Sequence, residues 1–89
     1  TVAVRILREL APHLEKRVGH WLPSAELRTM LITDENSEFF DWYQVNPISA
    51  KSIKKYLVKE AGVTHERQSR GSVYNLSDIR DLVQRYVQA

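Results

Sequence analysis

The chain has 89 residues, of which 43% are hydrophobic, and it contains no cysteine. This composition supports a single small core over residues 1–89 and excludes a disordered chain, disulfide bonds, a thiol nucleophile and thiolate metal sites. The net charge is only +2, and no segment approaches the roughly 18 apolar residues of a membrane-spanning helix. We therefore expect a soluble, intracellular domain without a membrane partner. Because the first residue is threonine, we expect it to come from a longer chain.

The N-terminal segment predicts two helices. Apolar residues recur at helical spacing between Val2 and about Arg17, at Ala3, Ile6, Leu7, Leu10 and Leu14. Pro12 lies within this stripe, which predicts either a bend or a second helix beginning near it. Farther along, Ser24 is a suitable N-cap for a helix that runs to Ile32 with Leu27, Met30 and Leu31 inward.

An acidic and aromatic segment follows, which we call the insert (residues 34–43). It contains Asp34, Glu35, Glu38 and Asp41 without a base, and Phe39, Phe40, Trp42 and Tyr43 in a space of five residues. We expect a loop that one helical turn holds against the core. The aromatic side chains are expected in that core, with an exposed docking patch as the alternative.

The clearest predicted element is a helix from Ala50 to Ala61. At 100° per residue, one side carries Ala50, Ile53, Leu57 and Glu60 to Ala61. The opposite side carries Lys51, Ser52, Lys55, Val58 and Lys59, with Lys54 at the border. Gly62 is expected to form a left-handed C-cap, with Val63 making the accompanying hydrophobic contact.

A hairpin and a last helix are predicted after Gly62. Thr64 to Arg67 and Ser72 to Leu76 can pair around a tip at Gln68 to Gly71, since Gly71 tolerates positive φ. Ser77 is the expected N-cap of a helix with Ile79, Leu82, Val83 and Tyr86 on its inner face. Three helices, a hairpin and a closing helix predict a mostly helical α+β fold. We interpret it as a winged helix, the helix-turn-helix variant with a β-hairpin wing and a C-terminal helix.

The distribution of charge indicates a nucleic-acid partner. Between Ser49 and Tyr74 six bases stand against two acids, a local charge of +4. Cations on an exposed helix contact phosphates, and short polar side chains reach base edges in the major groove. An arginine at the hairpin tip can contact the minor groove or the backbone. The predicted DNA-binding residues are Lys51, Ser52, Lys54, Lys55, Lys59, Arg67 and Arg70. The alternative is an ordinary solvated helix face.

No catalytic centre is predicted. His13, His20 and His65 fall on different elements without metal-ligand spacing, and the three glycines are scattered rather than gathered in a phosphate-binding loop. Asp78 and Asp81 lie in the first turns of the last helix, where carboxylates favour the helix dipole. We therefore expect no enzyme activity of this domain, no catalytic residues, no metal and no cofactor.

Short motifs recur in an order that resembles a known family. They are Leu22-Pro23-Ser24-Ala25-Glu26-Leu27, Phe39-Phe40-Asp41-Trp42, Pro47-Ile48-Ser49, Ile53 with Leu57, Gly62-Val63, Tyr74, Asp78-Ile79 and Arg85-Tyr86. Over about Ile6 to Tyr86 the chain is similar to an uncharacterised winged-helix-like domain at the C-terminal end of primase-helicase ATPases of phages, plasmids and integrated elements. The family's wing carries more bases beside a Lys-Gly-Tyr sequence, whereas here Ser72-Val73 separates Gly71 from Tyr74.

The resemblance implies an accessory domain of a replicative primase-helicase that contacts duplex or forked DNA, in the cytoplasm of a bacterial or phage-infected cell. The expected partners are DNA and the parent ATPase, and the isolated domain is expected to be monomeric. Two alternatives remain. The insert could dock helicase subunits or another replication protein, or the domain could be a transcriptional regulator, for which no dimerisation helix is evident.

Overall fold

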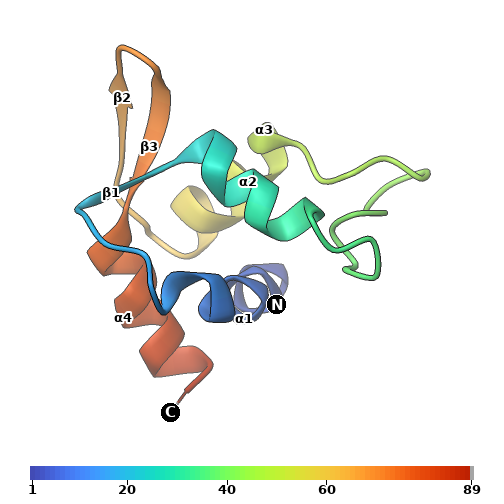
Figure 1. Cartoon of the computed structure of the whole chain (residues 1–89), viewed down its shortest axis with the longest axis horizontal. Helices are drawn as coiled ribbons and strands as arrows, with labels where there is room; N and C mark the ends of the chain where they lie inside the picture. Colours follow the sequence, from blue (N-terminus) through green and yellow to red (C-terminus); the bar gives the residue numbers. More distant parts are fainter. Residues whose placement is uncertain (89) are drawn as a thin grey trace.

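About half of the chain is helical in the computed structural model, which describes residues 1–88, and three short strands form one antiparallel sheet. In chain order the elements are α1 (Val2–Leu14), β1 (Trp21–Pro23), α2 (Ser24–Ile32), α3 (Ala50–Lys54), its π-helical continuation η1 (Lys55–Glu60), β2 (His65–Gln68), β3 (Gly71–Asn75) and α4 (Leu76–Tyr86). This confirms the α+β class. Figure 1 shows the β2–β3 hairpin and the long 33–49 connection projecting on opposite sides of α2 and α3.

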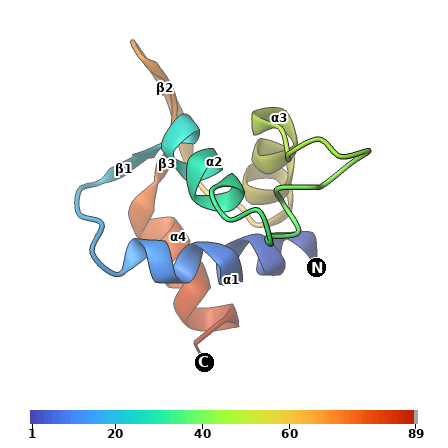
Figure 2. The same ribbon diagram turned by 45° about the vertical axis from the view of Figure 1, so that its right-hand side comes forward.

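Helix α1 packs through the apolar stripe that the sequence predicted. Ala3, Ile6, Leu7, Leu10 and Leu14 are all buried, and Thr1 Oγ1 accepts a hydrogen bond from the Val4 N–H. Pro12 does not divide the segment, because α1 runs through it to Leu14. It lies on the exposed side, where water can satisfy the carbonyl that loses its helical partner. Figure 2 shows α4 crossing α1 at the base of the molecule.

The core is one cluster beneath α2, α3 and the sheet. Its largest fully buried side chains come from every helix, two strands and the long connection, among them Leu10, Leu22, Leu27, Leu31, Phe39, Ile48, Ile53, Leu57, Tyr74 and Ile79. Met30, predicted to point inward, is only partly buried. Both the insert and α3 contribute residues to this cluster, so the two segments pack on the same hydrophobic core.

Strand β1 was not predicted, and it changes the sheet from a hairpin to three strands. The strand order is β1-β3-β2, with Leu22 opposite Tyr74 on one side of β3 and His65 opposite Tyr74 on the other. β1 is an edge strand, where Pro23 is tolerated because it need not donate a ladder hydrogen bond. The hairpin turns at Ser69-Arg70 between paired Gln68 and Gly71, and Gly71 has the expected positive φ, +120°.

Two predicted helix caps are wrong. Ser24 is the first residue of α2 rather than its cap; the capping position is Pro23, which makes no side-chain capping bond. Likewise Ser77 lies inside α4, whose N-cap is Asn75, with its Oδ1 accepting from the Asp78 N–H at 2.9 Å. In both places the strand runs directly into the helix, which leaves no room for the predicted serine cap.

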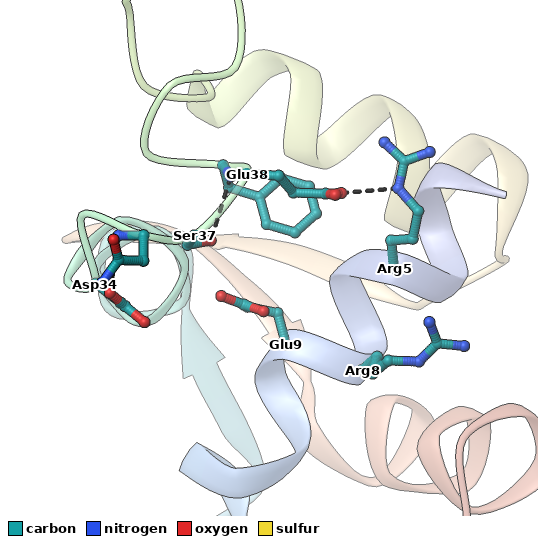
Figure 3. Close-up of a pocket in the computed structure, with 8 residues that line it drawn as sticks. Arg5, Arg8, Glu9, Asp34, Ser37 and Glu38 are labelled. Carbon is teal, nitrogen blue, oxygen red and sulfur yellow. Dashed lines mark hydrogen bonds and ion pairs between the residues drawn. The ribbon is translucent and has the colours of Figure 1, made fainter.

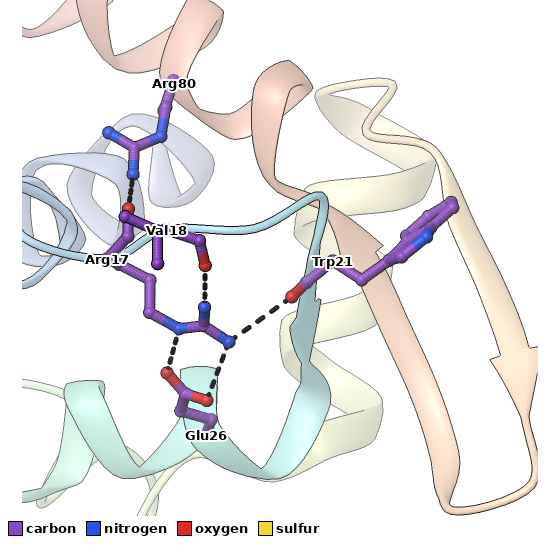
Figure 4. A network of polar contacts seen from close by, with 5 residues as sticks. All are labelled: Arg17, Val18, Trp21, Glu26 and Arg80. Atoms are coloured by element: carbon purple, nitrogen blue, oxygen red, sulfur yellow. Dashed lines mark hydrogen bonds and ion pairs between the residues drawn. The ribbon is translucent and has the colours of Figure 1, made fainter.

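A polar network fastens the connection between α1 and β1 (Figure 4). The Arg17 guanidinium donates to both Glu26 carboxylate oxygens, at 2.6 and 3.2 Å, and also to the carbonyls of Val18 and Trp21. Arg80 of α4 donates in turn to the Arg17 carbonyl. The α1–β1 connection is thereby tied to both α2 and α4, which holds β1 against β3.

The connection between α2 and α3 contains consecutive turns and not the predicted helical turn. The N–H groups of Ser37 and Phe40 donate to carbonyls three residues back, at 2.9 and 3.1 Å. Phe39 is buried in the core, whereas Phe40 and Tyr43 are exposed. The expectation that the insert aromatics belong to the core is therefore right for Phe39, partly right for half-buried Trp42, and wrong for the other two.

Candidate nucleic-acid interface

Six side chains of α3 and η1, together with the first residue of β2, line a groove of about 510 Å³. We call it the lysine groove; its lining residues are Lys51, Ser52, Lys54, Lys55, Val58, Lys59 and His65. Five of the seven residues predicted to bind DNA are therefore gathered in one depression. The other two, Arg67 and Arg70, are exposed on the hairpin and do not line it.

The start of the helix beneath the groove is fixed by three contacts. Ser49 Oγ accepts from the Ser52 N–H at 3.1 Å, which satisfies one of the unpaired donors of the first turn. Ile48 is fully buried, and its carbonyl accepts a hydrogen bond from Arg28 Nε of α2 at 2.9 Å. Lys51 is thus presented from a helix end that is both capped and anchored.

The end of the helix brings His65 beside it. Gly62 has φ +79°, and the Gly62 and Val63 N–H groups donate to the carbonyls of Val58 and Leu57, at 3.2 and 2.9 Å. Val63 is buried against the core, so the predicted C-cap and its hydrophobic contact are confirmed. Asp78 Oδ2 of α4 then accepts from the Thr64 N–H at 2.9 Å. This short, held connection places β2 along the same helix.

The π-helical segment changes which lysines share a side. In an α-helix, residues five apart lie about 140° apart around the axis. In η1 the bonds instead span five residues, as between the Ala61 N–H and the Tyr56 carbonyl at 3.1 Å, so residues five apart come near to alignment. Lys54, which the α-helical wheel placed at the border, therefore joins Lys59 in the groove. The wheel was also wrong for Ala50 and Glu60, which are exposed.

The groove is electropositive because nothing in it neutralises the lysines. Four ammonium groups and one imidazole line it, and no carboxylate does. Within residues 1–88 the ion pairs are Arg5–Glu38 and Arg17–Glu26, neither of which involves a groove residue. Lys55 Nζ lies 5.5 Å from the centroid of the Tyr56 ring, a weak cation–π contact that leaves its charge free. An anion entering the groove would meet four ammonium groups and no carboxylate.

The hairpin extends this positive surface. Side chains two apart on a strand point to the same face, so Arg67 shares its face of β2 with His65, whereas Glu66 points the other way. Tyr74, the cross-strand neighbour of His65, is buried on the same face of the sheet. Burial raises the pKa of the Tyr74 phenol, and a hydrogen bond with Ser24 acts in the opposite direction. The base of the hairpin packs on the core through Tyr74, whereas Arg70 at the turn is exposed.

Two groove residues have contacts that the sequence interpretation did not give them. His65 is an exposed surface histidine that also lines the groove, and its position three residues after the Gly62 stop could have placed it beside the helix. Ser52 was assigned only to base contacts, but its Oγ also accepts from Ser49 Oγ at 3.1 Å. The Ser52 hydroxyl hydrogen is not used in that bond and remains able to donate to an acceptor in the groove.

A second depression, of about 350 Å³, lies between α1 and the insert (Figure 3). It has charges of both signs, and its Arg5 Nε and Glu38 Oε1 are paired at 2.7 Å. The charges there compensate one another, unlike those of the lysine groove. Within residues 1–88 no group of three or more histidines, aspartates or glutamates is placed to hold a metal ion, and none of the helices is long and apolar enough to cross a membrane.

Comparison of the chain with protein-family models, with curated proteins and with solved structures found no match. The interpretation of the lysine groove therefore depends on the chemistry of the groove residues themselves.

Proposed function

We propose that this domain is a winged helix that binds duplex or forked DNA as an accessory domain of a replicative primase-helicase. The observation that supports DNA binding is the lysine groove, where four lysines from one helix converge with no acid among them. The resemblance of the sequence motifs to a primase-helicase family supports the replicative setting. The order of α3–η1, hairpin and α4 supports the winged-helix interpretation.

In this proposal α3 and η1 lie along the major groove of duplex DNA. The four lysines neutralise phosphates, while Ser52 donates to a base edge and Val58 offers an apolar contact to a thymine methyl group. The hairpin follows the neighbouring backbone or minor groove through Arg67 and Arg70. Four neutralised phosphates predict a salt slope of about −3.6, so affinity should fall roughly a hundredfold between about 50 and 200 mM salt.

The test is fluorescence anisotropy with labelled duplex, forked and single-stranded DNA at several salt concentrations. We expect preferential binding to duplex or fork. Reversing two charges, Lys51→Glu with Lys55→Glu, should weaken that binding by about a hundredfold or more and reduce the salt slope by about 2. Both side chains are exposed, so the variant should remain folded, which circular dichroism checks.

A matched control separates local contacts from net charge. Arg8→Glu on α1, with Lys16→Glu in the turn that follows it, makes the same change in total charge at two exposed residues outside the groove. This control should retain most of the affinity. Equal losses in the two double variants would show that only overall charge matters, and an unchanged affinity of the Lys51/Lys55 variant would contradict the groove assignment.

A protein-docking role remains the second candidate, because the insert carries exposed apolar side chains. Phe40 is 39% and Tyr43 68% exposed, next to acidic Asp41. Absence of binding to all three DNA forms at about 50 mM salt, where phosphate contacts are strongest, would favour docking to a protein.

A further inference from the structure

The loop after the insert ends in a tight turn that displays apolar side chains to solvent. Tyr43 and Asn46 pair with each other, and the two residues between them have positive φ, +49° at Gln44 and +59° at Val45. For a β-branched residue this conformation is strained. Tyr43 is 68% and Val45 83% exposed. We call residues 41–46 the tip; it is visible as the projecting end of the long connection in Figure 1.

The tip is held rigidly in spite of its exposure. The N–H groups of Trp42 and Tyr43 donate to the Asn46 carbonyl, at 2.9 and 3.2 Å, and the Asn46 N–H donates back to Tyr43 at 3.0 Å. At its base, Trp42 stacks on buried Phe39 with ring centroids 5.3 Å apart. A fixed loop loses little conformational entropy on binding, so the tip is preorganised for contact.

The tip and the lysine groove have opposite charge. Asp41 belongs to the tip, and Asp34, Glu35 and Glu38 precede it; Glu38 is paired with Arg5, and Asp34 accepts a hydrogen bond from the Asn36 N–H. The lysine groove supplies four cations around Val58. At about 510 Å³, the groove falls in the size range of pockets that admit a side-chain-sized ligand. The aliphatic stems of the lysines and Val58 can surround an aromatic ring while the ammonium groups meet carboxylates.

We propose that the tip of one copy of this chain docks in the lysine groove of a second copy, with Tyr43 and Val45 against Val58 and Asp41 facing the lysines. The two surfaces are different, so the contact is head-to-tail, and an open assembly retains one free groove at one end and one free tip at the other. The contact would occupy the same lysines as DNA. Docking of a tip and binding of DNA would therefore exclude each other at any one groove.

This association should be weak and salt-dependent. A single tip in one groove buries less than the area typical of stable complexes, which suggests a dissociation constant on the order of 100 µM. The isolated domain, which the sequence predicts to be a monomer, should therefore be mainly monomeric only at low protein concentration or at high salt. Because no DNA is involved, the test remains valid if the proposed DNA binding fails.

Sedimentation velocity of the 89-residue chain, over protein concentrations up to about 1 mM at low and high salt, measures the association. The tip variant, Asp41→Lys with Tyr43→Ser, and the groove variant, Lys54→Glu with Lys55→Glu, should each remain monomeric. Mixed together they should form a one-to-one dimer, because an intact groove in the first meets an intact tip in the second. Asp81→Lys with Tyr86→Ser, a matched change at exposed positions on α4, should associate as the unmodified chain does.

Two results would overturn the proposal. The first is an unmodified chain that remains monomeric at about 1 mM in low salt, where charge attraction between tip and groove is strongest. The second is an unmodified chain that associates although the mixed variants do not. Circular dichroism confirms that each variant is folded, so a failure to associate cannot be attributed to unfolding.

Discussion

The lysine groove and the insert are neighbours in the chain but are constructed differently. The groove is displayed on α3 and η1, where a regular backbone determines which side chains face outward. In the insert and its tip, nonregular turns place buried Phe39 directly beside exposed Phe40. Ser49, the N-cap of α3, lies at the boundary between them. A charged surface on a helix can be inferred from the periodicity of the sequence. Which side chains of an irregular loop are exposed depends instead on the contacts that each residue makes.

The largest expected effect distinguishes the two adjacent phenylalanines of the insert. Phe39 is 1% exposed and touches the core, so Phe39→Ala should lower the free energy of unfolding by about 3–5 kcal/mol. Phe40→Ala, at 39% exposure, should cost about 1 kcal/mol or less. Chemical denaturation of both variants measures the difference. If the Phe39→Ala variant stays folded in buffer and loses no more free energy of unfolding than the Phe40→Ala variant, the insert is not part of the core.

The next effect lies at the boundary between the two regions. Ser49→Ala removes the cap of α3 and should cost about 1 kcal/mol, while fraying of the first turn releases Lys51 and weakens DNA binding. Ser52→Ala is the control for stability, because its backbone N–H can still donate to Ser49 Oγ. Its loss of one hydroxyl contact is partly offset by the helix propensity of alanine. Chemical denaturation compares the two variants, and anisotropy measures the affinity of Ser49→Ala against that of the unmodified chain. Equal losses of stability in the two variants would mean that the Ser49 cap does not hold the first turn of α3.

The elements with internal periodicity could be predicted from the sequence. The buried stripe of α1 and the inward Ile53 and Leu57 follow from spacing, and the Gly62–Val63 stop follows from a local rule. Five groove residues were likewise predicted, because the spacing of the buried Ile53 and Leu57 leaves the lysines and Ser52 on the remaining sides of the helix, although Lys54 was placed only at the border. Local regularity was sufficient for these assignments.

The missed features depend on partners that are distant in sequence. β1 has three residues and becomes a strand only because β3, some fifty positions later, pairs with it. The π-helical geometry of η1 and the exposure of Phe40 and Tyr43 have no periodic signal. His65 enters the groove because the Thr64–Asp78 hydrogen bond and the sheet direct the chain there. Packing between segments, and not local propensity, determines each of these features.

The smallest expected effect concerns Val45, and it tests why a strained residue occupies the tip. Val45→Gly relieves a positive φ that glycine adopts readily, so it should raise the free energy of unfolding by up to about 1 kcal/mol, as thermal denaturation would show. Val18→Gly is the matched control, because Val18 is similarly exposed at 78% but is not among the residues with positive φ. Glycine there should lower stability slightly, since it only increases the freedom of the unfolded chain.

Sedimentation of the same Val45→Gly variant makes the result informative for function. If the apolar side chain is used in tip-to-groove docking, the more stable variant should associate less than the unmodified chain. A gain in stability with unchanged association would mean that Val45 does not contribute to the contact, and the docking would have to depend on Tyr43 and Asp41 alone. A loss of stability would instead show that side-chain contacts of Val45 outweigh its backbone strain, so the tip would be a structural turn rather than a strained binding element.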